Sequence, residues 1–508
     1  MASSDVSPPA VTGVAFPRTD GDKRSTTVTG RAVFADAARP VDARLAERIA
    51  AERDWHKRYL VHARELLEAR LRSAQHSMAV PQAGLDSLHR RFVFARGGED
   101  LPLAAAIAAP TGPAFDTVAI TGEGEREREL SVPYKGQRLR GDDLHRQLDR
   151  WVAKGTVEPS FAEAVRAVLR HPEWLDLSDR RVAIMGAGAE MGPLHSLSRW
   201  GATVLPVDLP HAALWQRILT TVRGGCGRAL VPVRGRAAAA DDDALAEVSG
   251  ADLITDLPEV CAWLAAADGP LTLGNYVYAD GAVHVQVAMA VDALCEHLTA
   301  RRDDVSLAVL ATPTDVFAVP EDAVAMAQER YAEGGLRRRL EHGARMVSRG
   351  AVFSPNYPGV ITTEEGLRFG IADCLVAQQG PNYALAKRLQ RWRASVARAQ
   401  GTLASVNIAA PTRTRSVLKN RALAAAYAGA RRFGIEVFDP STSNTLMAAL
   451  LVHDLRNTKA PAQPDVPLEH PLQLFIQGAN HGGLWRNPFA PRSVLSLAVL
   501  LGMVQRGA

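Results

Sequence analysis

The sequence predicts an α/β fold built on a doubly wound parallel sheet, and two observations support this prediction. Short apolar runs typical of buried strands recur along the chain, at residues 182–185, 202–207, 228–233, 251–255 and 305–310. Segments of helical composition separate several of these runs, as at residues 193–200, 211–223 and 283–300. Strands that alternate with helices in this way form parallel sheets with both faces covered.

The length of the chain predicts more than one structural unit. A chain of 508 residues exceeds the size of one compact domain. We expect a mostly helical N-terminal domain at residues 41–178, because residues 41–78 are dense in Ala, Leu, Glu and Arg. The sheet is expected in residues 179–508, with an insertion at about residues 316–380. Residues 1–40 are expected to be a disordered tail, since their first part is rich in Ser, Thr, Pro and Gly.

Charge and cysteine content narrow the classes of partner. The 59 Lys and Arg against 55 Asp and Glu leave a net charge of only +4, which does not indicate a nucleic-acid partner. No apolar stretch is long enough to span a bilayer, so no membrane partner is expected. The four cysteines are far apart and form no Cys-x-x-Cys pair, which favours a reduced cytoplasm over disulfides or zinc. We expect a cytoplasmic homo-oligomer that binds a small-molecule substrate and no metal.

A glycine turn follows the strand expected at residues 182–185. Gly186, Gly188 and Gly192 would let a pyrophosphate approach the backbone at the start of the next helix, because glycine has no Cβ. Asp208 stands at the tip of the following strand, about 20 residues on, where an acidic side chain meets the adenosine ribose hydroxyls. The alternative is a structural turn with an incidental Asp. The combination of strand, turn, helix and Asp favours a nucleotide site.

Tyr383 and Lys387 lie four residues apart in a segment expected to be a helix, so they share one helical face. An ammonium beside a phenol stabilises the phenolate and lowers the pKa of the phenol. Such a Tyr exchanges a proton with a substrate oxygen. The alternative is a chance pair one helical turn apart.

This segment and those that follow it resemble the short-chain dehydrogenase/reductase family. After the Tyr-x-x-x-Lys pair, residues 401–414 contain a strand of the type Val-Asn-x-x-x-Pro and a loop that ends in Thr, as in that family. Residues 441–455 resemble the family's later helix, and residues 472–483 resemble its last strand with a closing glycine pair. The resemblance covers roughly residues 180–485.

The resemblance implies a Rossmann-like sheet and an NAD(P)-dependent oxidoreductase that interconverts an alcohol and a carbonyl. It implies that Tyr383 is the general acid/base, and that Lys387 holds the nicotinamide ribose and lowers the pKa of Tyr383. Asp208 implies NAD, with NADP as the second choice, because a carboxylate repels a 2′-phosphate. The implied cofactor-binding residues are Gly186, Gly188, Ala189, Glu190, Met191, Gly192, Asp208, Lys387, Asn407, Pro411, Thr412 and Thr414.

Two of the family's motifs are replaced in this chain. Gly370 stands where the family's catalytic Ser is expected, so we expect the hydroxyl to come from Thr312 or Thr314, at the end of the preceding strand. The insertion would then separate that strand from the catalytic helix. Residues 255–258 take the place of the Asn-Ala-Gly that follows the family's fourth strand.

Two other functions stay open at this point. An S-adenosylmethionine-dependent methyltransferase also joins a glycine turn to an acidic residue after the second strand, although that interpretation leaves Tyr383 and Lys387 unexplained. A catalytically silent nucleotide-binding scaffold would account for the missing Ser. The N-terminal domain and the insertion suggest a bulky substrate, and the basic run at residues 337–339 suggests an acidic group on it.

Overall fold

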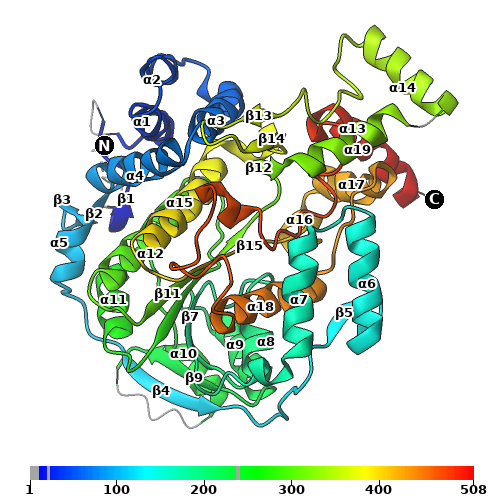
Figure 1. Ribbon diagram of the computed structural model, residues 1–508. Helices are drawn as coiled ribbons and strands as arrows, with labels where there is room; N and C mark the ends of the chain where they lie inside the picture. The colour runs from blue at the N-terminus through cyan, green and yellow to red at the C-terminus, as the bar shows by residue number, and fades with distance from the viewer. Residues whose placement is uncertain (1–10, 20–22, 236–240, 334, 508) are drawn as a thin grey trace, which may run out of the picture.

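The computed structural model describes residues 11–19, 23–235, 241–333 and 335–507. Its central feature is a seven-stranded sheet in the order β15-β11-β10-β7-β8-β9-β4 (Figure 1). β4 is antiparallel to β9, whereas the other neighbouring strands are parallel. The strands are β4 (Asp116–Thr121), β7 (Arg181–Met185), β8 (Thr203–Val207), β9 (Arg228–Val233), β10 (Leu271–Asn275), β11 (Val305–Ala311) and β15 (Ala404–Ile408). The prediction of an α/β fold with a mostly parallel sheet is confirmed.

Helices cover both faces of this sheet, because the side chains of each strand alternate between two apolar cores. In β7, Ala183 and Met185 belong to one core, and Val182 and Ile184 belong to the other. The helices over the first core include α11 (Leu257–Ala265), α12 (Gly281–Thr299) and α15 (Gly380–Ala399). Those over the second include α8 (Leu194–Arg199), α9 (Ala212–Arg223), α10 (Asp242–Val248) and α18 (Pro440–Arg456).

The N-terminal helices pack on the outside of α15 and belong to the first core. They are α1 (Thr26–Ala38), α2 (Ala43–Ala50), α3 (Trp55–Leu71) and α4 (Ala74–Arg91), and α1, α3 and α4 contact α15 directly. Phe34 and Leu88 lie in the same apolar cluster as Met185 of the central strand. Residues 41–178 therefore do not enclose a core of their own, and their strand β4 joins the main sheet.

The predicted disordered tail is wrong over residues 26–38, which form α1. Two local features explain the helix despite its many Thr residues. The Ser25 hydroxyl caps it by accepting a hydrogen bond from the Val28 amide at 3.3 Å. Val33 and Phe34 then bury their side chains in the core, and such burial outweighs low helix propensity.

Smaller elements complete the N-terminal half. A three-stranded sheet joins β1 (Gly13–Ala15), β2 (Val93–Arg96) and β3 (Glu99–Pro102), and a hairpin joins β5 (Val132–Tyr134) and β6 (Gln137–Leu139). The helices here are α5 (Leu103–Ala108), α6 (Gly141–Ala153), α7 (Pro159–Arg170) and the short 3₁₀ helix η2 (Pro172–Leu175).

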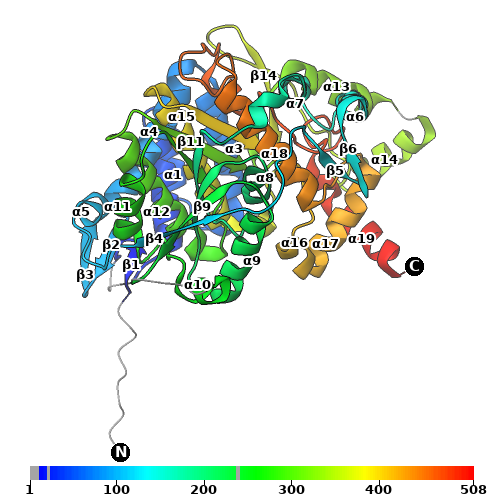
Figure 2. The same cartoon turned by 90° about the horizontal axis from the view of Figure 1, so that it is seen from below.

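The insertion between β11 and α15 carries a second small sheet in the order β12-β14-β13. Its elements are β12 (Val316–Pro320), α13 (Glu321–Ala332), α14 (Gly335–Val347), β13 (Ile361–Thr362), β14 (Arg368–Asp373) and η3 (Ala377–Gln379). After β15 come α16 (Arg415–Lys419), α17 (Arg421–Ala430), η4 (Arg431–Phe433), η5 (Pro471–Phe475) and α19 (Pro491–Gly507). In both views α13, α14, α17 and α19 lie at the same end of the molecule (Figures 1 and 2).

Two predicted strands are wrong. Residues 251–255 form a turn, in which Asp252 accepts a hydrogen bond from the Ile254 amide and its own amide donates to Asp256. Asp side chains that bond nearby amides in this way favour turns over strands. The fourth parallel strand is instead β10.

Residues 472–483, the second of these, form η5 and a glycine-containing loop. Pro471 and a hydrogen bond from the Leu472 amide to the His470 side chain start a 3₁₀ turn there.

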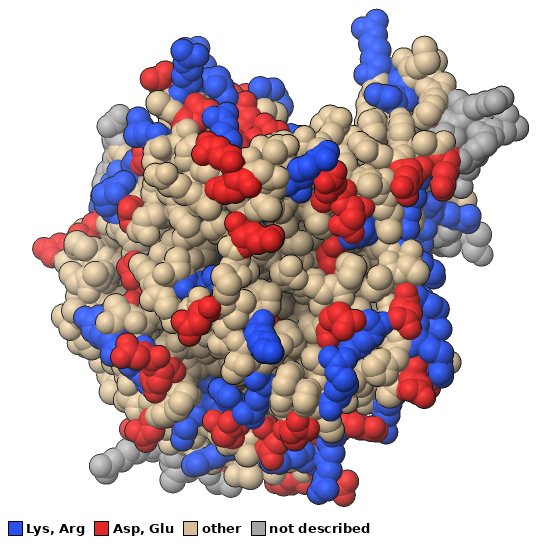
Figure 3. Space-filling model, in the orientation of Figure 1, with Lys and Arg blue, Asp and Glu red and all other residues tan. Residues whose placement is uncertain are grey.

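No helix in the part of the chain that the structure describes is both long and apolar enough to cross a membrane. On the face shown in Figure 3, acidic and basic side chains are interspersed.

Candidate functional site

The glycine turn follows β7 at the carboxyl edge of the sheet. Gly186 has a φ of 83°, a left-handed conformation that favours glycine, and a Cβ there would lie 3.0 Å from the backbone of Tyr276. A Cβ at Gly188 would lie 2.3 Å from Cδ1 of Leu214. The turn closes on itself through a hydrogen bond of 2.9 Å from the Gly192 amide to the Ala189 carbonyl. The conformation and packing of the turn itself therefore require glycine at position 186, whereas a side chain at position 188 would displace the tip of Leu214.

Asp208, at the end of β8, holds this turn in place. One carboxylate oxygen accepts a hydrogen bond from the Gly188 amide, and the other accepts one from the Leu209 amide, both at 2.8 Å. Burial raises the pKa of Asp208, and the two amide hydrogen bonds act in the opposite direction. The predicted pair of glycine turn and acidic residue thus comes together, and the carboxylate directly contacts the turn.

Glu190 joins the glycine turn to the segments that follow β15. Its carboxylate accepts a hydrogen bond from the Arg415 amide at 2.7 Å and forms an ion pair with the Arg415 guanidinium at 2.9 Å. Its backbone carbonyl accepts a hydrogen bond from Asn444 of α18 at 3.2 Å. The loops after β7 and β15, both predicted to bind the cofactor, are therefore in direct contact.

Tyr383 and Thr312 are brought together, although 71 positions separate them in the sequence. Tyr383 is in the first turn of α15, and Thr312 follows β11. Burial raises the pKa of Tyr383 well above its usual value, and a hydrogen bond with Thr312 lowers it. The Thr312 hydroxyl also bonds the Thr314 hydroxyl at 2.8 Å, which accepts a hydrogen bond from Gln379 at 3.0 Å. The structure thus places the predicted hydroxyl beside the predicted phenol.

Lys387 lies in the same cluster, and its ammonium has a polar side chain as its partner within the protein. Its ammonium donates to Gln390 at 3.1 Å, and Gln390 donates to Asn275 at the end of β10, also at 3.1 Å. Burial lowers the pKa of Lys387 to about 8, helped by the Arg391 charge and opposed by Asp315. The expected lowering of the Tyr383 pKa by Lys387 is not seen, because burial of the phenol dominates.

His284 completes this cluster from α12. Its ring lies 5.4 Å from the Tyr383 ring and 5.3 Å from the Tyr278 ring, between centroids. The side chain is 1% exposed, and neither ring nitrogen has a hydrogen-bond partner among the described residues. Burial lowers its pKa to about 3, and the Lys387 charge lowers it further, so the imidazole is neutral. Buried polar atoms without a hydrogen-bond partner are uncommon in folded proteins.

Asp315 anchors α15 against the end of β11. Its carboxylate forms ion pairs with Arg388 at 2.9 Å and with Arg391 at 2.6 Å, and it is 1% exposed. It also accepts a hydrogen bond from the Val316 amide. This buried carboxylate fixes the helix that carries Tyr383.

Four predicted residues lie in β15 or in the loop after it and have hydrogen-bond partners within the protein. Asn407 donates to Ser405 on the face of the sheet covered by α18, away from α15. The Thr412 hydroxyl is buried against Ser443 at 2.6 Å. The Pro411 carbonyl accepts a hydrogen bond from Phe438 at 2.8 Å, and Thr414 bonds Ser416 at 2.9 Å. These residues shape the loop next to Glu190.

Three members of the cluster were missed by the sequence prediction: Asn275, His284 and Gln390. Asn275 was missed because residues 251–255 were taken as the fourth strand. The apolar run 271–274, which starts after Gly-Pro and ends in Asn, was the signal for the correct strand. His284 and Gln390 stand on helices and have no local sequence signal, since only the packing of α12 against α15 gives them a common neighbour.

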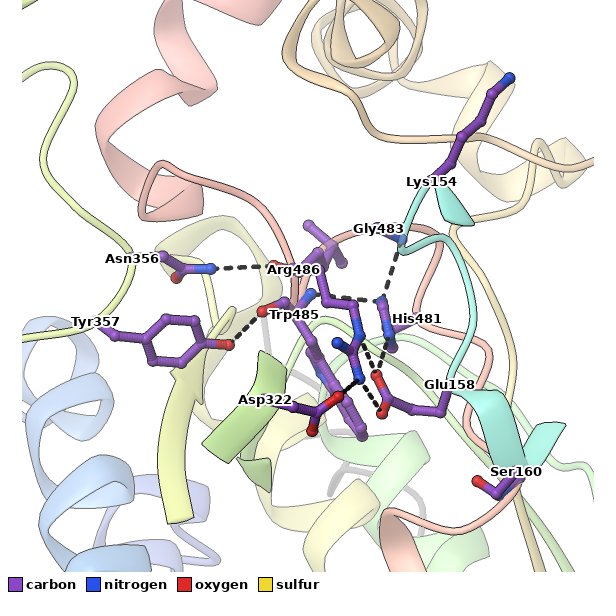
Figure 4. Close-up of polar contacts among 12 residues, drawn as sticks. Lys154, Glu158, Ser160, Asp322, Asn356, Tyr357, His481, Gly483, Trp485 and Arg486 are labelled. Atoms are coloured by element: carbon purple, nitrogen blue, oxygen red, sulfur yellow. Dashed lines mark hydrogen bonds and ion pairs between the residues drawn. The ribbon is translucent and has the colours of Figure 1, made fainter. Parts of the chain in front are cut away.

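A second buried polar cluster lies outside the predicted site (Figure 4). Glu158 accepts hydrogen bonds from Arg486 at 2.7 and 2.9 Å and bonds His481 at 2.9 Å. Arg486 also pairs with Asp322 of the insertion at 2.7 Å. Burial opposes ionisation of Glu158, but His481 and Arg486 outweigh it and lower its pKa to about 2. These hydrogen bonds and ion pairs connect α7, the insertion and the loop before α19.

A cavity of about 860 Å³ opens elsewhere, between the ends of α6 and α13, η4 and the loop before α19, and none of the predicted site residues lines it. The side chains of the basic run at residues 337–339 lie outside the described part of the structure. Among the described residues, no group of three or more His, Cys, Asp and Glu is placed to hold a metal ion. Comparisons of the chain with protein-family models and with curated protein sequences found no match.

Proposed function

We propose that this protein is an NAD-dependent oxidoreductase that interconverts an alcohol and a carbonyl, with NADP as the second choice of cofactor. One observation carries the proposal: Tyr383, Thr312 and Lys387 gather near the carboxyl ends of β10 and β11. The glycine turn of β7 lies at the same edge of the sheet. Ligands of parallel sheets bind outside this edge.

The order of the strands supports a dinucleotide site. Numbered along the chain, the six parallel strands β7, β8, β9, β10, β11 and β15 have the spatial order 3-2-1-4-5-6, which is typical of Rossmann-like sheets. The order reverses between β7 and β10, and open α/β sheets bind dinucleotides outside the point of reversal. Gly186 follows the first of these strands and Asn275 ends the second.

The groups at this edge fit a dinucleotide. Each Asp208 oxygen accepts one hydrogen bond from the protein, so each keeps a lone pair for a ribose hydroxyl. The amides of Glu190 and Met191 donate to no described residue, so they are available for phosphate oxygens. The Glu190 carboxylate would repel a phosphate, but its ion pair with Arg415 offsets that charge.

The residues of the cluster then have distinct roles. When bound, NAD supplies the acceptor for the hydride that leaves the substrate carbon. Tyr383 takes the proton of the substrate hydroxyl on its phenolate oxygen and returns it in the reverse direction. The hydrogen bond from Thr312 stabilises that phenolate, and the Lys387 ammonium donates to the ribose of the nicotinamide. Neutral His284 supplies a second acceptor or donor beside the phenol.

A catalytically silent nucleotide-binding protein is the second candidate. The observation that favours it is the burial of Tyr383, which raises the pKa of the phenol and so disfavours the phenolate. Such a protein would bind a nucleotide through the glycine turn and Asp208 but would have no catalytic activity.

Ligand titration separates these functions. We expect NADH to quench the intrinsic fluorescence of the 8 Trp residues saturably, NADPH to bind more weakly, and S-adenosylmethionine not to bind. Saturation with S-adenosylmethionine alone would favour a methyltransferase instead. Oxidation of NADH is then followed with a panel of aldehydes and ketones.

The Tyr383→Phe variant tests the chemistry. It should lose turnover and keep its affinity for NADH, because only the phenol oxygen is removed. Tyr278→Phe is the matched control, since Tyr278 lies beside Tyr383 but bonds Asp280 and is 53% exposed. If NADH binds and no substrate in the panel is reduced by the unaltered protein, the scaffold is the better description.

A further inference from the structure

The cavity of about 860 Å³ is a second place where the fold can bind a small molecule. It is lined by the end of α6 at Lys154, by Arg330 of α13, by residues 431–436 and by residues 487–489. Its volume is in the range of small-molecule sites, about 300–1,000 Å³. It lies at the end of the molecule that the insertion and the C-terminal helices occupy (Figures 1 and 2).

Basic side chains outnumber acidic ones around this cavity. The basic ones are Lys135, Lys154, Arg330, Arg431 and Arg432, and the acidic ones are Glu333, Glu341 and Glu436. Glu436 is already neutralised by Lys135, at 3.1 Å. By contrast, the side chains of Lys154, Arg431 and Arg432 make no ion pair or hydrogen bond with any residue in the described ranges. These three cations are therefore available to an anionic ligand.

Arg330 forms part of the rigid base of the cavity. Its guanidinium donates to the Arg486 and Lys154 carbonyls, both at 3.1 Å, which connects α13 to the end of α6. Burial and the nearby Arg486 charge lower the pKa of Arg330. Arg486 itself is committed to Glu158 and Asp322, whereas the Lys154 side chain extends away from that cluster (Figure 4). Arg330 therefore holds the base of the cavity in place, and the Lys154 side chain extends outward from it (Figure 4).

Apolar side chains also line the cavity, and they include Phe433 and Phe489. Phe433 and Phe489 are nearly perpendicular, at 82°, with ring centroids 6.5 Å apart. Phe353 also packs against Phe489, with ring centroids 5.3 Å apart. Ile435 and Pro488 complete this apolar lining. A flat apolar group of a ligand would pack against these aromatic rings with little loss of conformational entropy.

We propose that this cavity binds a small organic phosphate, with its phosphate among Lys154, Arg431 and Arg432 and its apolar body against Phe433. Three cations exceed what a single carboxylate requires, whereas a phosphate dianion offers more charge and three acceptor oxygens. The site is independent of the glycine turn, because none of the residues around Asp208 or Tyr383 lines it.

Calorimetric titration of the full chain tests this site with three probes: phenyl phosphate, inorganic phosphate and benzoate. Phenyl phosphate should saturate one site. Inorganic phosphate lacks the ring, and benzoate carries only one charge. Each should therefore bind at least about tenfold more weakly than phenyl phosphate. Equal affinity for benzoate and phenyl phosphate would overturn the assignment to phosphates, and so would the absence of saturable binding by phenyl phosphate.

Variants locate the binding. Arg431→Gln combined with Arg432→Gln should weaken phenyl phosphate binding at least about tenfold, and both side chains are exposed, so the fold should be kept. Arg421→Gln is the matched control, an exposed cation at the start of α17 that does not line the cavity. Phe433→Ala should weaken phenyl phosphate but leave inorganic phosphate unchanged. Equal weakening by Arg421→Gln, or none by the double variant, would overturn the proposal.

Discussion

Asp315 and Arg391 form a buried ion pair at 2.6 Å that joins the end of β11 to α15. Arg388 adds a second ion pair to the same carboxylate at 2.9 Å. Since α15 also carries Tyr383, this one carboxylate fixes the position of the phenol relative to Thr312, which stands just before Asp315 in the chain. The stability of this part of the fold and the geometry of the proposed site thus depend on the same residue.

Asp315→Asn should destabilise the protein by about 3–5 kcal/mol, because it leaves two buried guanidinium groups without their counter-charge. Urea unfolding followed by circular dichroism measures this change. The matched control is Asp439→Asn, which removes a half-exposed ion pair with Arg413 and should cost at most about 1 kcal/mol. If both variants lost the same free energy of unfolding, the buried ion pair would contribute no more to stability than the half-exposed one.

His284 should make stability depend on pH. Its pKa in the folded protein is about 3, against 6.5 for an ordinary histidine. Between these values the unfolded chain binds a proton that the folded protein does not, so stability falls as the pH falls below 6.5 and is unaffected above it. At pH 5 the loss is about 2 kcal/mol.

Unfolding curves of His284→Gln at pH 7 and pH 5 check this expectation. The variant should lose less stability between the two pH values than the unaltered protein does, whatever its absolute stability. His297→Gln, on the same helix but only partly buried, should retain most of the pH dependence. An unchanged pH dependence in His284→Gln would contradict a buried neutral imidazole.

Lys387 should make cofactor affinity depend on pH at the alkaline side. With a pKa of about 8, it carries its charge at pH 7 and loses it as the pH rises through 8. NADH affinity should therefore fall between about pH 7 and pH 9. Lys387→Gln should bind NADH more weakly and show no such fall. A parallel fall in both proteins would assign the pH dependence to another group.

The parts of the fold that the sequence predicts correctly are those with strong local signals. The runs that became β7, β8 and β9 are rich in Val and Leu and are flanked by glycine or helical segments, so their type and boundaries follow from composition. Residues 251–255 have a similar apolar content, but Asp252 and Asp256 bond local amides and form a turn instead. Apolar content alone does not reveal that competition.

Contacts within the candidate site could be predicted from the sequence only where the residues belong to one helix or one motif. Tyr383 and Lys387 share a helical face, so their proximity to each other follows from spacing. The contact of Tyr383 with Thr312 follows from the parallel topology only if residues 316–380 are recognised as an insertion, because α15 then directly succeeds β11. His284 enters from α12, and a contact between two helices far apart in the sequence has no local signal.

The central claim is that the glycine turn with Asp208 and the cluster with Lys387 are the two ends of one dinucleotide site. Calorimetry with half-ligands measures this most directly, with AMP for the adenosine end and reduced nicotinamide mononucleotide for the other. Asp208→Asn should weaken AMP only, Lys387→Gln should weaken the mononucleotide only, and each should weaken NADH. Failure of NADH to bind the unaltered protein, or NADH affinity that neither substitution changes, would contradict the account.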